Sequence, residues 1–184
     1  MKIHIRNGRL IDPASKTDKA QDLFVAAGRI VGVGHAPAGF EANSVLDATG
    51  CIVCPGLVDL AARLREPGFE YRATLESEMA AAAAGGVTRL ACPPDTDPVL
   101  DEPGLVEMLT HRARSRNGAH VHPVGALTVQ LAGATLTEMG ELTEAGCVAF
   151  SHADVPLLDT ELLRRAMQYA ATFDYPLWLR PTDP

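Results

Sequence analysis

The sequence has little of several features that mark common classes of protein. It has no apolar run approaching the length of a membrane span, and its first residues, Met1 to Arg6, alternate polar and apolar side chains where a secretory signal has an unbroken apolar segment. It has no basic cluster to offset a net charge of −7, which comes from 16 basic and 23 acidic residues. These absences argue against a membrane protein, a secreted protein, and a binder of nucleic acid or anionic membranes.

Cysteine is also scarce. The chain has four cysteines, and two of them, Cys92 and Cys147, lie in apolar segments, which suits a reducing compartment better than a disulfide framework. Cys51 and Cys54 have the spacing of half a zinc ribbon, but no second pair of this kind exists, so we expect no structural zinc there. The sequence therefore predicts a cytoplasmic protein.

The sequence does contain a change in the pattern of expected secondary structure near residue 55. Residues 1–54 read as short strands separated by turns, at about 3–5, 22–25, 29–33 and 44–47, and predict a small β domain. From residue 55 to residue 184, strands alternate with longer helical patterns, which is typical of βα units around a parallel sheet. The expected strands are 56–60, 87–92, 121–126, 147–151 and 176–180, and the expected helices are 72–84, 103–116, 136–145 and 160–173.

Five strands and four helices in strict alternation fit two architectures, a doubly wound sheet or the first part of a (β/α)8 barrel. A complete barrel typically needs about 250 residues. No glycine-rich phosphate loop follows the first of these strands, which disfavours a dinucleotide-binding fold. The pattern alone leaves the two architectures open.

Several segments resemble dihydroorotases, the cyclic amidohydrolases of pyrimidine biosynthesis. They are, in chain order, "NGRLIDP", "CPGLVDL", "LREPGFEYRATLESEMAAAAAGGVT", "DTDPVLDEP" and "TEMGELTEAGCVAFS". The resemblance covers essentially the whole chain, and "LREPG" with "TEMGEL" favours dihydroorotases over hydantoinases and allantoinases. It implies an α/β fold: a small β-sandwich-type domain in residues 1–54, then the N-terminal part of a (β/α)8 TIM barrel in residues 55–184. The barrel is incomplete, so we expect a fragment, or one part of an assembly.

The resemblance also implies a zinc site, and here the first two ligand positions differ. Active family members carry His-x-His at the end of the first barrel strand, because alternate residues of a strand point to the same side. This chain has Ala61 and Arg63 at those positions. A methyl group has no lone pair and a guanidinium stays protonated, so neither can bind a dication.

The later ligand positions differ as well. The family places an aspartate ligand after the fourth strand, in a run similar to "AFSDDG", where this chain has His152, Ala153 and Asp154. The histidine ligand at the end of the fifth strand is replaced by Arg180. We therefore expect no metal cofactor. The alternative is that His152 and Asp154 remain as weak ligands of zinc.

The residues that the resemblance assigns to the substrate carboxylate have changed in part. Arg65 in "LREPG" is retained, but the asparagine of the second position is Asp95, which would repel that carboxylate. Both positions are therefore expected to be vestigial. We predict instead an arginine–carboxylate network, in which Arg63 and Arg180 pair with acids drawn from Asp95, Asp97 and Asp154.

One His-x-His does occur, at His120 and His122. It falls at the start of the third barrel strand, whereas barrel chemistry lies at the carboxyl ends of the strands. We expect a structural or surface role for this pair, with adventitious metal binding as the alternative.

Together these changes indicate a dihydroorotase-like pseudoenzyme, with no catalytic residues, that keeps the fold and lacks the zinc site. Resemblance to inactive homologues implies aspartate transcarbamoylase as a structural partner, in a homo- or hetero-oligomer. The competing hypothesis is an active zinc-dependent cyclic amidohydrolase with a reduced or displaced metal site, completed by residues beyond position 184. A third hypothesis is a sensor that binds a dihydroorotate-like ligand through Arg65.

Overall fold

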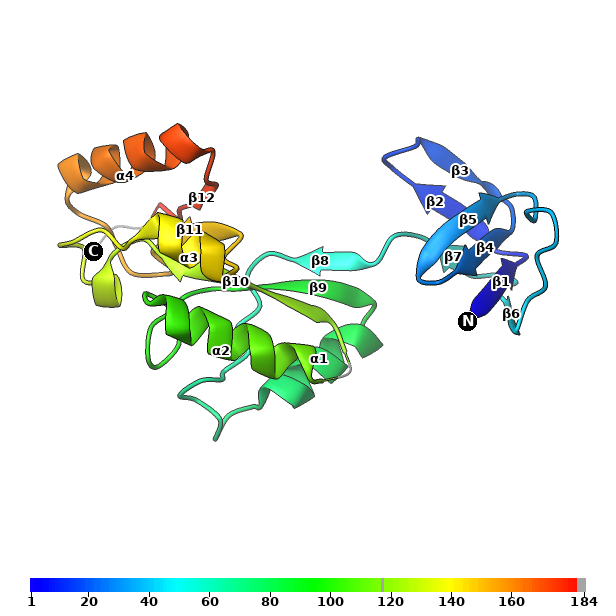
Figure 1. Ribbon diagram of the computed structural model, residues 1–184, viewed down its shortest axis with the longest axis horizontal. Coiled ribbons are helices and arrows are strands. Elements are labelled where there is room, and N and C mark those ends of the chain that lie inside the picture. The colour runs from blue at the N-terminus through cyan, green and yellow to red at the C-terminus, as the bar shows by residue number, and fades with distance from the viewer. Residues whose placement is uncertain (117, 182–184) are drawn as a thin grey trace. The chain divides into compact units, whose positions relative to one another are not determined.

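The chain divides into two compact units. A computed structural model describes residues 1–116 and 118–181, and the division separates Met1–Pro55 from Gly56–Pro184 (Figure 1). Each unit has sheets of its own. No helix in the described part of the chain is both long enough and apolar enough to cross a membrane.

The first unit holds two small sheets. The four-stranded sheet has the order β5-β4-β1-β6 and consists of β1 (Lys2–Arg6), β4 (Leu23–Ala26), β5 (Arg29–Val33) and β6 (Ser44–Asp47). The three-stranded sheet has the order β3-β2-β7 and consists of β2 (Arg9–Asp12), β3 (Thr17–Ala20) and β7 (Ile52–Val53). The sequence predicted the first sheet and missed the second. The sequence of β3, Thr-Asp-Lys-Ala, has no apolar alternation, because this exposed edge strand buries no face.

The second unit is a curled, parallel half-barrel sheet with helices on its outside. Its strands follow one another in chain order, as β12-β11-β10-β9-β8, and every neighbouring pair is parallel. The strands are β8 (Leu57–Asp59), β9 (Val87–Cys92), β10 (His120–Ala126), β11 (Ala149–Ser151) and β12 (Leu177–Trp178). The helices are α1 (Leu75–Ala84), α2 (Pro103–Arg114), α3 (Met139–Ala145) and α4 (Thr160–Phe173), with the short 3-10 helix η1 at Val129–Leu131. All five predicted strands and all four predicted helices are present.

The ends of the helices follow local capping chemistry. The helix α1 begins at Leu75, three residues later than predicted, because the Thr74 hydroxyl accepts the Ser77 N–H as an N-cap. The C-terminus of α3 is capped by Gly146, which has a left-handed conformation with φ of 119°. The helix α4 begins after Asp159, whose carboxylate accepts the backbone N–H groups of Glu161 and Leu162 in the first turn.

Two groups of buried side chains hold the second unit together. The larger group lies between the sheet and the helices, where α1 packs on β9 and both α2 and α3 pack on β10. The smaller group lies on the other, inner face of the sheet and contains Ala91, Val124 and Ala149, with Trp178 packed against them. On the edge strand β8, Leu57 and Val58 are each 56% exposed. The edge strand β8 therefore carries apolar surface that the half-barrel leaves uncovered.

Candidate functional site

Four charged side chains meet at the carboxyl-terminal edge of the half-barrel sheet. Arg63, Asp95, Asp154 and Arg180 come after β8, β9, β11 and β12, respectively. Because the carboxyl ends of parallel strands lie at one edge of a sheet, residues far apart in sequence come together there. A cavity of about 220 Å³ opens at this edge, and its lining includes Ala61, Arg63, Ala153, Asp154, Trp178 and Arg180.

These four side chains form a continuous arginine–carboxylate network. The Arg63 Nε donates to Asp95 Oδ2 at 2.6 Å, and the Arg63 Nη2 donates to Asp154 Oδ2 at 2.6 Å. The Arg180 Nη1 donates to the other oxygen of Asp154, Oδ1, at 2.8 Å. The predicted pairing of both arginines with carboxylates is confirmed. Asp97, the third predicted partner, is exposed and has no ion pair with any described residue.

The network is graded from partly buried to exposed. The side chains of Arg63 and Asp95 are 31% and 29% exposed, whereas those of Asp154 and Arg180 are 52% and 68% exposed. The hydrogen bond from Arg180, followed by the charge of Arg63, lowers the pKa of Asp154 below its ordinary value. The hydrogen bond to Asp95 raises the pKa of Arg63. Both shifts favour the charged forms of Asp154 and Arg63, and the network pairs two guanidinium groups with two carboxylates.

His152 lies below this edge as a buried structural residue. It is 3% exposed, and both of its ring nitrogens have partners within the protein. Nδ1 lies 2.8 Å from the Val155 carbonyl oxygen, so Nδ1–H is the donor there, and Nε2 lies 2.9 Å from the Thr128 hydroxyl. The same hydroxyl accepts the N–H of Gly133 at 3.0 Å, which leaves its proton for Nε2 of His152. The histidine thus ties the turn after β11 to the loop after β10.

Two alanines occupy the remaining positions at which the family resemblance implies metal ligands. Ala61 donates its backbone N–H to the Asp59 carboxylate at 2.9 Å, and it lines the same cavity as Arg63. Ala153 has a left-handed backbone with φ of 51°, in a turn closed by its N–H and the Ser151 hydroxyl at 3.0 Å. That turn brings Asp154 within reach of both arginines.

Arg65 is separate from the network. It is partly buried and lines a small recess together with Asp95, Thr96 and Cys92. Asp95 in that recess already accepts the hydrogen bond from Arg63. Burial raises the pKa of the Cys92 thiol to about 12, so this neighbouring sulfur is not a nucleophile.

Sequence reasoning missed Glu66, the neighbour of Arg65. Its side chain is 7% exposed and forms an ion pair with Arg112 of α2. Its second oxygen, Oε2, accepts the backbone N–H of Leu75, the first residue of α1, at 2.8 Å. The carboxylate therefore fixes two helices to the loop after β8, at a helix N-terminus where negative charge is favourable. No pattern in the sequence marks this role, because both partners are set by tertiary packing.

The residues at this edge do not fit a zinc ion. Zinc needs three or four lone-pair donors from deprotonated side chains. Asp154 has both carboxylate oxygens bound to guanidinium groups, and His152 has both nitrogens hydrogen-bonded. Within residues 1–116 and 118–181, no group of three or more His, Cys, Asp or Glu side chains is placed to hold a metal ion. Cys51 and Cys54 are exposed free thiols in the other unit.

The predicted His-x-His pair lies away from this network. His120 is the first residue of β10, and His122 follows two residues later, at the amino-terminal end of the strand. The Nε2 of His122 lies 3.0 Å from the Arg89 guanidinium on β9, so a cation stands where a metal ion would approach. The pair belongs to a different cavity.

Comparison with known proteins places the chain in a family. The family model described as "Dihydro-orotase-like" matches residues 50–180. The chain belongs to the dihydro-orotase-like family. A "Dihydroorotase-like protein" of Pseudomonas aeruginosa is 51% identical over 174 residues, which is 95% of this chain and 41% of that protein. A "Dihydroorotase" of Solibacter usitatus is 45% identical over 177 residues, 96% of this chain and 41% of that protein. The chain thus spans about two-fifths of the length of these relatives.

Solved structures establish the fold. The L-hydantoinase of Arthrobacter aurescens superposes with a TM-score of 0.79 at 22% identity, over 97% of this chain and 40% of that chain. A dihydroorotase crystal structure superposes with a TM-score of 0.64 at 15% identity, over 99% of this chain and 52% of that chain. Of the two architectures that the alternation of strands and helices left open, the partial TIM barrel is correct.

Proposed function

We propose that this dihydro-orotase-like chain belongs to a non-catalytic, cytoplasmic protein of pyrimidine biosynthesis that assembles with an aspartate transcarbamoylase-type subunit. The observation that carries the proposal is the pairing of the Arg63 guanidinium with two carboxylates. This arginine stands where the family resemblance implies a histidine ligand, and two carboxylates, Asp95 and Asp154, bind its guanidinium at 2.6 Å each. A permanent cation held in this way repels a divalent metal ion and occupies the position at which that ion would bind.

The chemistry of the family requires more than an open cavity. Hydrolysis of a cyclic amide by metal-activated water needs a Lewis acid and a water molecule of lowered pKa. At this edge Asp154 is held in its charged form by Arg180 and Arg63, and His152 is buried with both nitrogens bonded. Asp95 would also repel the carboxylate of a dihydroorotate-like substrate. These features support a scaffold that has exchanged a metal site for an ion-pair network.

A structural role requires only the surface of the fold. An interface can be kept while catalytic side chains change, since function depends on sites placed on a fold and not on the fold itself. Aspartate transcarbamoylase is the partner that the family resemblance implies. The names of the relatives are consistent with both kinds of member, since one is a "Dihydroorotase-like protein" and another a "Dihydroorotase".

The activity is tested by incubating the full chain with dihydroorotate, with and without added zinc, and following ring opening and closure. An active zinc-dependent dihydroorotase in the same assay is the control. We expect no turnover above the protein-free blank. Turnover that disappears in Asp154→Ala would overturn the proposal in favour of an amidohydrolase with a reduced metal site.

The partner is tested separately by sedimentation of the chain with an aspartate transcarbamoylase subunit. We expect a complex that also forms with Arg63→Gln, because a scaffold surface does not need the network. Independent sedimentation of the two proteins would remove this part of the proposal while leaving the lack of activity intact.

A further inference from the structure

Three loops at the carboxyl-terminal edge of the half-barrel sheet are joined to one another by hydrogen bonds. These edge loops connect β9 to α2, β10 to α3 and β11 to α4, and they comprise residues 93–102, 127–138 and 152–159. The Asp101 carboxylate accepts the Gln130 N–H at 2.7 Å, which joins the first loop to the second. The Thr128 hydroxyl lies 2.9 Å from Nε2 of His152, which joins the second loop to the third. The edge loops therefore lie side by side and form one surface.

Three apolar side chains of the edge loops lie in water. Val129, Val155 and Leu158 are 43%, 42% and 68% exposed. His152 joins their loops, because its Nδ1 donates to the Val155 carbonyl at 2.8 Å and its Nε2 is bonded to Thr128, the residue before Val129. Single apolar residues at a surface need no explanation, but three on joined loops form an apolar patch, which indicates a site of protein contact.

The backbone beside this apolar patch is strained. Gln130 and Leu131 follow Val129 directly and have φ angles of 52° and 56°. Two successive left-handed residues that carry a Cβ atom are unfavourable, and such conformations are concentrated in segments that serve a function. The strained turn buries Leu131 and leaves Val129 exposed, so burial in the core does not explain the position of Val129.

The edge loops carry charge of one sign. They contain seven acidic residues and no lysine or arginine. Two of these acids, Asp95 and Asp154, are bound by Arg63 in the ion-pair network. The other acids have no ion pair with any described residue, and they are Asp97, Asp101, Glu102, Glu138 and Asp159. An apolar patch bordered by carboxylates complements a partner surface that is apolar at its centre and basic around it.

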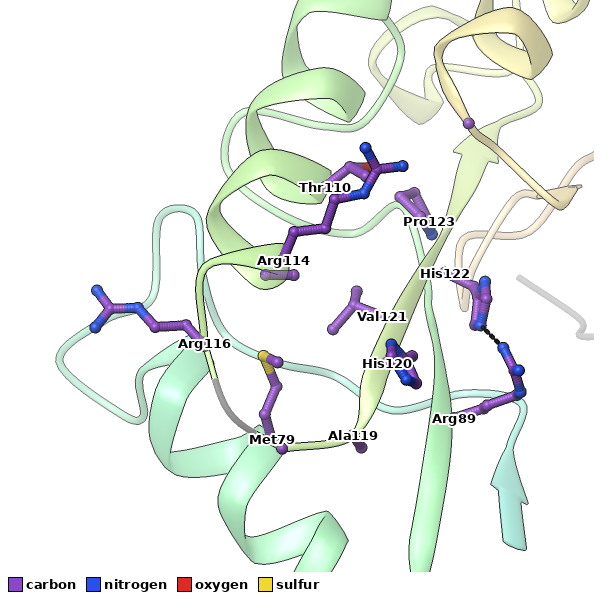
Figure 2. A pocket seen from close by; sticks show the side chains of 13 residues that line it. Met79, Arg89, Thr110, Arg114, Arg116, Ala119, His120, Val121, His122 and Pro123 are labelled. Carbon is purple, nitrogen blue, oxygen red and sulfur yellow. Dashed lines mark hydrogen bonds between the residues drawn. The ribbon is translucent and has the colours of Figure 1, made fainter. Parts of the chain in front are cut away.

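The opposite, amino-terminal end of the sheet has the reverse charge. A cavity of about 280 Å³ at that end is lined by three arginines, and none of its described lining residues carries a carboxylate. Figure 2 shows Arg114 and Arg116 near the end of α2 and Arg89 on the neighbouring strand β9. Of these three, only Arg116 has an ion pair within the described residues, with Glu76. A basic partner surface is therefore attracted to the carboxyl-terminal edge and repelled from the amino-terminal end.

We propose that the apolar patch is the surface through which the chain binds its partner subunit, which meets the patch with apolar side chains surrounded by lysines and arginines. This inference rests on the proposed function and names the surface used for the assembly. The patch lies at the end of the barrel where substrate enters an active enzyme of this fold. The network already spans that end, since Arg63 follows β8 and Asp154 follows β11. A partner that covers this end would inhibit an enzyme, but it does not impair a non-catalytic scaffold.

The apolar centre is tested by sedimentation of the full chain with the aspartate transcarbamoylase-type subunit. Leu158→Gln is the disrupting variant. Met167→Gln is the matched control, because Met167 is also more than half exposed and lies on the helix α4, outside the edge loops. We expect Leu158→Gln to weaken the complex about tenfold and Met167→Gln to leave it unchanged. Both variants should melt at the temperature of the original chain, since neither side chain is buried.

The acidic border is tested in the same assay at low and high ionic strength. Glu138→Gln removes a charge from the border without removing a helix cap, because the Glu138 side chain forms no capping hydrogen bond. Glu107→Gln is the matched control at an exposed position on α2. We expect Glu138→Gln to weaken the complex several-fold at low salt, and the difference from the original chain to disappear at high salt. Equal weakening by the two variants would show an effect of net charge alone and overturn the proposal.

The remaining outcomes separate this surface from the proposed partner. A complex that Leu158→Gln and Glu138→Gln leave undiminished would overturn the surface and keep the partner. Independent sedimentation of the original chain and the subunit would remove the partner and this surface together. The chain is also sedimented alone, and self-association that Leu158→Gln abolishes would place a second copy on the patch and overturn the assignment to a basic partner.

Discussion

Replacing Arg63 by glutamine removes the guanidinium that joins the two carboxylates of the network. Glutamine keeps most of the aliphatic stem and a hydrogen-bond donor, so the variant tests the charge and the two-branched geometry more than the packing. The loss falls on Asp95, which is 29% exposed, and on Asp154, which is 52% exposed. Because Asp95 is less hydrated, the loss of the guanidinium raises the free energy of its carboxylate more than that of Asp154.

The size of the effect follows from this burial. A hydrogen bond to a charged group contributes about 1.5–3 kcal/mol when it is shielded from water. An exposed ion pair contributes only about 0.2–1 kcal/mol. We therefore expect a coupling energy of about 1.5 kcal/mol between Arg63 and Asp95, and about 0.5 kcal/mol between Arg63 and Asp154. Arg63→Gln alone should lower the free energy of unfolding by about 2 kcal/mol.

The assay is a double-mutant cycle on urea unfolding, with Arg63→Gln, Asp95→Asn and the double variant. Trp178 is the single tryptophan of the chain and lines the same cavity as Arg63, so its fluorescence reports the relevant unit. The matched control is the exposed pair of Glu161 and Arg164 on α4, whose side chains are 51% and 55% exposed. A coupling for Arg63 and Asp95 no larger than that of the control would refute the reasoning.

Three further predictions concern other parts of the chain. Glu66→Gln should lower the free energy of unfolding by about 2 kcal/mol, since it breaks the ion pair of a nearly buried carboxylate with Arg112; a thermal melt indistinguishable from that of the original chain would contradict this. Thiol alkylation of the native chain near pH 8 should label two of the four cysteines and spare Cys92 and Cys147, which are buried and have pKa values raised to about 12. Labelling of all four cysteines before unfolding would contradict this prediction. Because the folded-state pKa of Asp154 lies below its ordinary value of 3.8, its contribution to stability is complete above that pH and is lost as the pH falls through the folded value. The destabilisation caused by removing its charge should therefore be constant from about pH 5 to 8 and shrink below about pH 4, and a decrease that begins near neutral pH would contradict this assignment.

The elements of the half-barrel could be predicted from the sequence because their signals are local. Gly146 ends a helix through its left-handed backbone, and Asp159 starts one by accepting N–H groups, whatever the rest of the chain does. The second sheet of the first unit escaped prediction because its edge strand β3 buries no face and so shows no alternation. Apolar and polar residues alternate only in a strand that buries one face, so this alternation cannot reveal a strand that buries neither face.

The network could be predicted because two general rules act together. Carboxyl ends of parallel strands converge, and arginines in partly buried positions need carboxylate partners. The same rules could not say which acids would be used, since Asp97 lies only two residues from Asp95 and remains outside the network. The roles of Glu66 and His152 were also beyond sequence reasoning. Each depends on a partner brought close by the fold, such as Thr128, which lies 24 residues from His152 in the chain.

The ion-pair network makes a stepwise change to a metal site difficult. Restoring histidines at Ala61 and Arg63 alone would leave Asp95 and Asp154 without their shared cation, and His152 would keep both of its hydrogen bonds. Conversion to a metal centre therefore requires several coordinated substitutions. The step at Arg63 alone leaves the Asp95 carboxylate without its cation, which is the costly state for a partly buried charge.

The central claim is that the ion-pair network stands in place of a zinc centre, and the zinc content of the full chain tests it most directly. The chain is dialysed against added zinc and then against metal-free buffer, and zinc per chain is measured by elemental analysis. We predict far less than one zinc per chain, both in the original protein and in Asp154→Ala. Stoichiometric zinc in the original protein, lost in Asp154→Ala, would contradict the account and show that the carboxylate binds metal and not the two arginines.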